Sequence, residues 1–235
     1  MPTSGVSNFQ VTTNQVIEAA FRLIGVYGTG ETPSAADYTN ATQALNIAIK
    51  SWQTKGILVW AVEEMLIPMV VGQNKYPLGP AGSYAFRPLR VTDAFIRNAS
   101  NVDLNLQILS RQEYLLFGLK NTQSIPTSCY YDQQLTNGQL YIFGANSDAT
   151  RVIHLFVQRP IQDMVAGTDN FDFPQEWFQA IKWGLASELA PEYGVTGIQL
   201  QLIETKAQSY LSDMSDWSQE DVSTFFTPNN RSMNA

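Results

Sequence analysis

Residue types that carry out catalysis are few and scattered in this sequence. His154 is the only histidine, and it lies within an alternating segment, residues 151–158, that favours a β-strand. A metal site needs several donor side chains, so we interpret this histidine as structural. Cys129 is the only cysteine, which rules out a disulfide within one chain. No nucleophile signature surrounds it, and we interpret it as a buried thiol.

One glycine-rich segment, residues 25–30 (GVYGTG), faintly resembles a phosphate loop. A phosphate loop follows a strand and ends in Lys and Ser or Thr, whereas this segment follows a predicted helix and precedes Glu31. We interpret it as a helix stop. Carboxylates are numerous, but no pair stands out as the acid and base of a glycosidase. The sequence therefore predicts no catalytic residues, no cofactor and no metal.

Charged residues are sparse, at 15% of the chain against roughly 25% in soluble domains, and the net charge is −7. Arg87, Arg90 and Arg97 are near one another, but we interpret them as solvated charges at strand edges. The sequence therefore argues against binding nucleic acid through its phosphates. A polar, weakly charged surface suits either a protein covered by neighbours or an ordinary globule. The first residues lack the features of a secretory signal, and no apolar run is long enough to span a bilayer, so we expect a soluble, cytosolically made protein.

The most informative element is a predicted helix in residues 172–194 (DFPQEWFQAIKWGLASELAPEYG), with Pro174 at or near its first position. Its apolar residues recur at helical spacing and continue around the cylinder, beyond one core-facing stripe. Such a helix must be covered on several sides, by its own fold or by another copy of the chain. This element therefore indicates packing and assembly and not catalysis.

Four further helices are expected, one of them short. The first begins after Thr12 or Thr13 and ends at the glycines of residues 25–28, and the second opens at Ser34 and stops at Gly56. A short helix starts at Ser110, in a capping box with Glu113. A last long helix is expected over about residues 196–216. Its apolar face is predicted to hold five residues: Ile198, Leu202, Ala207, Tyr210 and Leu211.

Between the second helix and residue 172, the hydrophobic period changes to about two, which indicates strands. Pro68 places residues 65–71 at a sheet edge or a bulge. In residues 102–109 the alternation predicts four inward side chains: Val102, Leu104, Leu106 and Ile108. Asn137 and Gly138 are the strongest hairpin signal. Further strands are expected over residues 75–78, 90–97, 128–135, 139–143 and 151–158.

These elements predict an α+β fold: a four-helix bundle with an inserted antiparallel β lobe and an extended C-terminal arm. The expected domains are a discontinuous helical bundle (10–60 and 172–216), the β lobe (61–171) and the arm (217–235). The arm is polar but contains residues that we take as interface anchors: Trp217, Val222, Phe225, Phe226 and Pro228. The alternative is a terminus without a binding role.

Several segments, in their order and spacing, resemble one family. These are residues 44–60 (ALNIAIKSWQTKGILVW), 109–115 (LSRQEYL, followed by Pro126, Tyr130, Tyr131 and Asp132) and 172–194. They are similar to the head-to-tail adaptor proteins of short-tailed, double-stranded-DNA bacteriophages, also called tail tubular protein A or packaged-DNA stabilisation proteins. No single segment is diagnostic, and the tail of the chain matches least well.

The resemblance implies a structural, non-enzymatic virion protein at the head–tail junction, without a membrane partner. It implies a homo-oligomeric ring, expected to have twelve subunits, that joins the portal protein to the tail nozzle protein and grips the portal with C-terminal arms. Packaged double-stranded DNA would be retained and then pass through the channel at ejection without specific binding. Three alternatives stay open: another neck or head-completion protein, a virion-associated cell-wall hydrolase and a nucleic-acid-binding protein.

Overall fold

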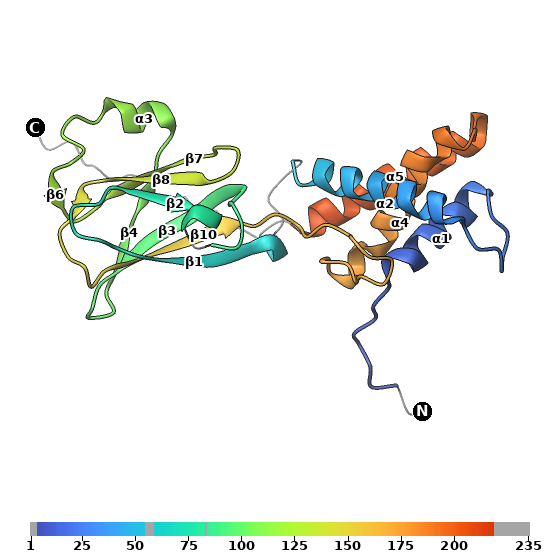
Figure 1. Cartoon of the computed structure of the whole chain (residues 1–235), viewed down its shortest axis with the longest axis horizontal. Coiled ribbons are helices and arrows are strands. Elements are labelled where there is room, and N and C mark those ends of the chain that lie inside the picture. The colour runs from blue at the N-terminus through green and yellow to red at the C-terminus, as the bar shows by residue number, and fades with distance from the viewer. Residues whose placement is uncertain (1–3, 55–58, 83, 219–235) are drawn as a thin grey trace, which may run out of the picture.

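The structure, a computed structural model, describes residues 4–54, 59–82 and 84–218 of the chain. Within them it contains five α-helices together with β-sheets, so the predicted α+β class is confirmed. Four helices form one end of the molecule, which we call the helical part, and the sheets and one short helix form the other, the β part (Figure 1). Each part has its own hydrophobic cluster. The four-helix bundle and the domain limits stay predictions.

The helical part is built around helix α4 (Phe178–Glu192), which α1 (Thr13–Ile24), α2 (Ala35–Trp52) and α5 (Gly197–Trp217) all contact. Between Phe178 and Ala190, only Gln179 and Glu188 of α4 are exposed. The apolar sides of this helix are thus covered by the same chain. The segment before α4 also joins this cluster, through Ile161, Met164 and Phe171.

Three helix starts and the end of α1 agree with the sequence. Thr12, Ser34 and Ser110 each cap a helix, and each cap is a capping box. Gly25 ends α1 in the left-handed conformation, with φ of 76°, which confirms that the glycine-rich segment begins as a helix stop. Helix α2 already ends at Trp52. The expected stop at Gly56 lies outside the described residues.

The predicted apolar face of α5 is partly wrong. Ile198 and Leu202 are 86% and 55% exposed, whereas Ile203 and Ala207 are buried against the helical cluster. Tyr210 and Leu211 are partly buried there. The helix has apolar residues on two neighbouring faces, and spacing alone does not determine which of the two faces meets α4.

The β part consists of two four-stranded sheets, which contribute to one cluster, and one two-stranded sheet (Figure 1). The first is antiparallel, in the order β1 (Val62–Pro68), β10 (Val152–Gln158), β3 (Arg90–Arg97), β4 (Asp103–Asn105). The second has the order β2 (Lys75–Leu78), β8 (Gly138–Phe143), β7 (Ser128–Asp132), β5 (Gln107–Ile108). The third pairs β6 (Gln123–Ser124) with β9 (Ala145–Asn146). Pro68 ends the edge strand β1, as a residue without an N–H should.

The segment expected as one strand over residues 102–109 is two strands in two different sheets. β4 belongs to the first sheet and β5 to the second, where β5 pairs parallel with β7. Leu106, between them, is buried, but Val102 and Ile108 are exposed, contrary to the prediction. The chain changes sheets at this point, so the period of two no longer keeps one face inward.

The Asn137-Gly138 signal correctly locates the β7–β8 hairpin but not its turn. Strand β7 ends at Asp132 and β8 begins at Gly138, so the connection is residues 133–137. Position 138 is occupied by glycine for a different reason: a Cβ there would lie 2.1 Å from the Tyr131 hydroxyl oxygen, so only glycine leaves room for the Tyr131 ring. The Asn137 side chain accepts a hydrogen bond from the N–H of Ala81.

Asp37, in the first turn of α2, connects three helices. Its carboxylate accepts hydrogen bonds from the Ser34 hydroxyl (2.6 Å), from Tyr27, which follows α1 (2.6 Å), and from Tyr193, which follows α4 (2.7 Å). These hydrogen bonds hold the pKa of Asp37 well below its ordinary value of 3.8. The ionised form therefore stabilises the fold.

We predict that Asp37→Asn lowers the unfolding midpoint at neutral pH, and that its effect decreases in acid. A carboxyl with a depressed folded-state pKa contributes its full stabilisation above its unfolded value, and this contribution is lost as the pH falls below 3.8. Thermal midpoints of both proteins from neutral pH to about pH 3 test this. Asp213→Asn, an exposed carboxylate on α5, is the control. An Asp37→Asn effect that does not change with pH would contradict the prediction.

A second prediction concerns the contact between α2 and α4. A Cβ on Gly184 would lie 2.5 Å from Cζ2 of the Trp52 ring. Alanine favours a helix over glycine by about 1 kcal/mol, but overpacking costs about 1–3 kcal/mol, so we expect Gly184→Ala to lose up to about 2 kcal/mol of unfolding free energy. Denaturant titration measures this. Gly118→Ala, which meets open space, should be neutral, and equal stability of the two variants would contradict the contact.

Candidate interaction surfaces

The structure describes one of the five predicted portal-binding residues. Trp217 is the last residue of α5, and 60% of it is exposed. The other four lie outside the described residues: Val222, Phe225, Phe226 and Pro228. An exposed tryptophan at a helix end can anchor an interface, because its large ring is buried only when a partner covers it.

The single histidine and the single cysteine both lie in surroundings that are typical of residues with a structural role. His154 stacks on Phe95, with ring centroids 4.5 Å apart, and its Nδ1 is 2.6 Å from Oε1 of Glu64. Cys129 is buried, and burial raises the pKa of its thiol to about 12. Such a thiol stays protonated at neutral pH and is a poor nucleophile. In the part of the chain that the structure describes, no group of three or more His, Cys, Asp or Glu side chains is arranged to hold a metal.

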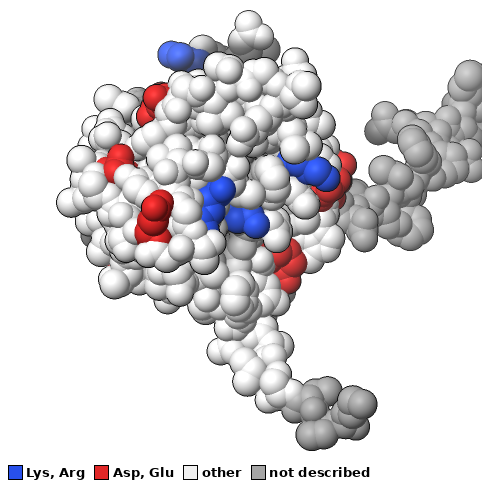
Figure 2. All heavy atoms as spheres, turned by 90° about the vertical axis from the view of Figure 1, so that its right-hand side faces the viewer, with Lys and Arg blue, Asp and Glu red and all other residues white. Residues whose placement is uncertain are grey.

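Basic side chains are spread out and often paired. Arg97 forms a two-bond salt bridge with Asp103, at 2.7 and 2.8 Å, and lies over the Phe95 ring. Arg159 makes a similar pair with Asp172. At the end of the molecule formed by the helices, charges of both signs lie scattered among uncharged residues (Figure 2). This face has no continuous basic surface of the kind that holds DNA.

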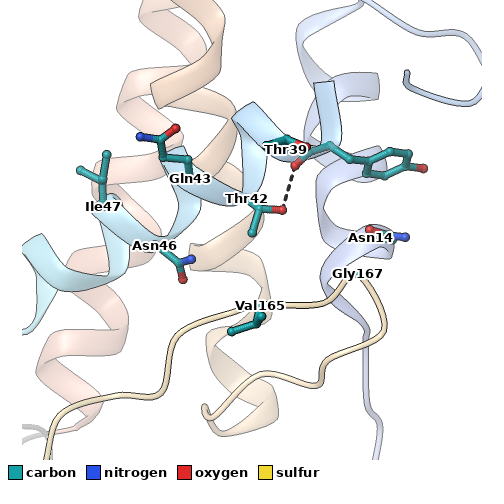
Figure 3. A pocket seen from close by; sticks show the side chains of 9 residues that line it. Asn14, Thr39, Thr42, Gln43, Asn46, Ile47, Val165 and Gly167 are labelled. Carbon is teal, nitrogen blue, oxygen red and sulfur yellow. Dashed lines mark hydrogen bonds between the residues drawn. The ribbon is translucent and has the colours of Figure 1, made fainter. Parts of the chain in front are cut away.

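An open pocket of about 490 Å³ lies between α2, the start of α1 and the loop around residue 165 (Figure 3). Its lining contains no charged residue: Asn14, Tyr38, Thr39, Thr42, Gln43, Asn46, Ile47, Val165 and Gly167. Asn46 fixes the loop, because its amide both donates to the carbonyl of Met164 and accepts from its N–H, each at 2.9 Å. The lining holds no carboxylate or histidine, the commonest groups in acid–base catalysis, and its amides and hydroxyls can hydrogen-bond a partner.

Large apolar side chains are exposed at both ends of the molecule. The hydrophobic period of the sequence assigned some of them inward and gave no assignment for the others. In the β part, the short helix α3 (Arg111–Leu116) buries only Tyr114 and leaves Leu115 and Leu116 exposed, with Leu119 shortly after it. In the helical part, Ile198 and Leu202 are exposed on α5. Exposed apolar residues that form a contiguous patch can mark contacts with other proteins. The shortness of α3 could have indicated this exposure, because a helix of six residues cannot bury every apolar side chain that it carries.

A comparison with known protein families gives a match over most of the chain. The family model of the SU10 adaptor protein, a phage head–tail adaptor family, matches residues 12–232. No curated protein matches the chain. No helix in the described ranges is both long and apolar enough to cross a membrane.

The match begins at the cap of α1 and runs through both parts of the structure to the last helix and beyond it. The match confirms the expectation of a phage adaptor at the level of the family. It does not extend to the finer expectations, which were the tail tubular protein A type and a phage with a short tail. The match covers nearly the whole chain, and the chain therefore belongs to the SU10 adaptor protein family.

Proposed function

We propose that this protein is a ring-forming head-to-tail adaptor, which joins the portal to the tail nozzle and extends the DNA channel at the head–tail junction of the virion. The observation that carries the proposal is the family match over residues 12–232. The ring is expected to have twelve subunits. The nearest alternative, another neck or head-completion protein, differs only in which virion components it contacts.

The exposed apolar residues support the proposal that the protein binds several partners. They are found on α3 in the β part and on α5 in the helical part, at opposite ends of the molecule (Figure 1). A subunit between the head and the tail needs separate surfaces for the components above and below it. A ring needs two more, because each subunit contacts its neighbours through different patches.

We propose that residues 217–235 form the main portal-binding arm. Trp217 is exposed at the end of α5, and the family match continues to residue 232, so it includes all but the last three residues of this segment. An extended polar arm with a few aromatic anchors can bind tightly, since those anchors supply most of the energy. From the composition of this segment we expect its ordering to be coupled to binding. We therefore expect the chain to form rings on the portal and to be monomeric or weakly associated without it.

The charge distribution supports a channel that DNA passes without being held. The chain has 21 acidic and 14 basic residues, and two of its arginines, Arg97 and Arg159, are engaged by carboxylates. The pocket described above gives the hydrolase alternative no support, because it is lined by uncharged residues.

The mass of the free chain and of its mixture with purified portal rings tests the proposal. We predict that the parent chain loads onto portals, and that Phe225→Ala with Phe226→Ala leaves the subunit folded but reduces loading. Each buried phenylalanine contributes about 1.5–3 kcal/mol, so losing both would weaken attachment by about 10²–10⁴-fold.

Leu135→Ala is the matched control for this prediction, because it removes an exposed apolar side chain from the β7–β8 connection instead. It should load like the parent. Equal loading by the double variant would place the arm elsewhere. Stable rings of the parent without any portal would contradict the expectation that the portal is needed.

We also predict that the purified protein does not bind duplex DNA appreciably at physiological salt, because it has a net charge of −7 and no basic cluster in its sequence. A salt titration with a labelled duplex measures this. Submicromolar binding that weakens steeply with salt would contradict the channel proposal and favour the nucleic-acid-binding alternative.

A further inference from the structure

The N-terminal segment before α1 is an exposed, uncharged arm. Residues 4–10 are all exposed, and the arm extends away from the helical part (Figure 1). Its two large apolar residues, Val6 and Phe9, are 70% and 63% exposed. Residues 1–13 of the sequence include no Lys, Arg, Asp or Glu. Phe9 meets the ring of Phe178 edge-on, with centroids 6.0 Å apart, and this contact leaves most of it uncovered.

The uncharged pocket on α2 has the chemistry to receive such a segment. The side-chain amides of Asn14 and Gln43 line it, and they make no hydrogen bond within the described residues. An amide both donates and accepts, which matches the N–H and C=O groups of an extended main chain. Ile47 and Val165 also line the pocket and are 62% and 87% exposed, so an apolar side chain can cover both.

The hydroxyl groups in the pocket are already engaged. Tyr38 donates to Glu18 at 2.7 Å, and Thr42 donates to the carbonyl of Tyr38 (Figure 3). The polar groups left for a partner are therefore the two amides and the acceptor positions of hydroxyl oxygens. A charged partner would find no charged residue in the lining itself, whereas an uncharged peptide would leave no charge unpaired. The arm is such a peptide.

The root of the arm is fixed beside the pocket of its own subunit. The N–H groups of Thr13 and Asn14 donate to the carbonyls of Asp169 and Gly167, at 3.0 and 2.9 Å, and Thr12 pairs with Asn170. From this point the arm leads away from the helical part (Figure 1). Asn14 and Gly167 also line the pocket. Each copy thus presents a pocket and, from its border, an arm that leaves it.

We propose that the N-terminal arm of one copy binds in the α2 pocket of a neighbouring copy. Val6 or Phe9 covers Ile47 and Val165, and the amides of Asn14 and Gln43 bond to the arm's main chain. Arm and pocket are different patches, so the contact is head-to-tail and repeats around a closed ring. This inference rests on the proposed ring and identifies one of its subunit contacts.

Disulfide trapping between two differently tagged chains tests the contact. One chain has Ser7→Cys in the arm, and the other has Thr39→Cys at the pocket. Only a contact between copies can join them. The native Cys129 can stay, because it is buried and its pKa is raised to about 12. The matched control replaces Thr39→Cys with Ser100→Cys, an exposed position in the turn between β3 and β4.

The mixtures are oxidised with and without portal rings, and the joined chains are measured by mass. We expect the arm–pocket pair to give about tenfold more product than the control pair in at least one condition, because docking raises the local thiol concentration. Adding Phe9→Asp to the arm chain or Ile47→Asp to the pocket chain should reduce the product to the control level. Equal products from both pairs in both conditions would overturn the inference.

Loading of the parent chain onto portals, measured alongside, separates this inference from the proposed function. Rings on the portal without selective arm–pocket product would overturn the inference and leave the adaptor function intact. Selective product without any loading would support the inference and contradict the adaptor function.

Discussion

The burial of helix α4 is the constraint on which the helical part depends. A helix with apolar residues around nearly its whole circumference cannot face water on any wide side, so three other helices must pack against it. The contact with α2 is close because Gly184 leaves room for the Trp52 ring. Asp37 then connects the ends of α1 and α4 to the start of α2. The apolar core and the hydrogen bonds of Asp37 together fix the positions of the helices that form the pocket.

The two parts meet at a small polar and aromatic junction. Arg159, just after β10, pairs with Asp172 before α4, and its Nε lies 3.8 Å from Glu63 of β1. Burial works to raise the pKa of Asp172, but hydrogen bonds from Arg159 and Gln162 outweigh it and keep the pKa below its ordinary value. Trp60 packs on Phe173 at the same place. The chain thus enters and leaves the β part through neighbouring segments, which Arg159 links through its contacts with Glu63 and Asp172.

The surfaces outside these cores have a common character. They carry few charges, several uncovered apolar side chains and a pocket without charged residues. These properties fit a subunit whose faces are covered by other chains, which is what membership of a phage adaptor family implies. The α4 helix itself is not one of those faces. Its apolar sides suggested either intramolecular or intermolecular cover, and the structure shows the intramolecular one.

The sequence by itself determined the fold class, the helix starts at Ser34 and Ser110, and most strands, because caps and hydrophobic periods are local properties. For the first helix it left Thr12 and Thr13 open as caps, and the structure has Thr12. It also indicated the structural roles of His154 and Cys129. Only the tertiary structure decided that Ile198 and Leu202 face outward, that the chain changes sheets at Leu106, and that Gly138 makes room for Tyr131. The α2 pocket likewise arises where segments more than a hundred residues apart meet. Such features depend on which neighbours an element packs against, and local sequence patterns do not contain that information.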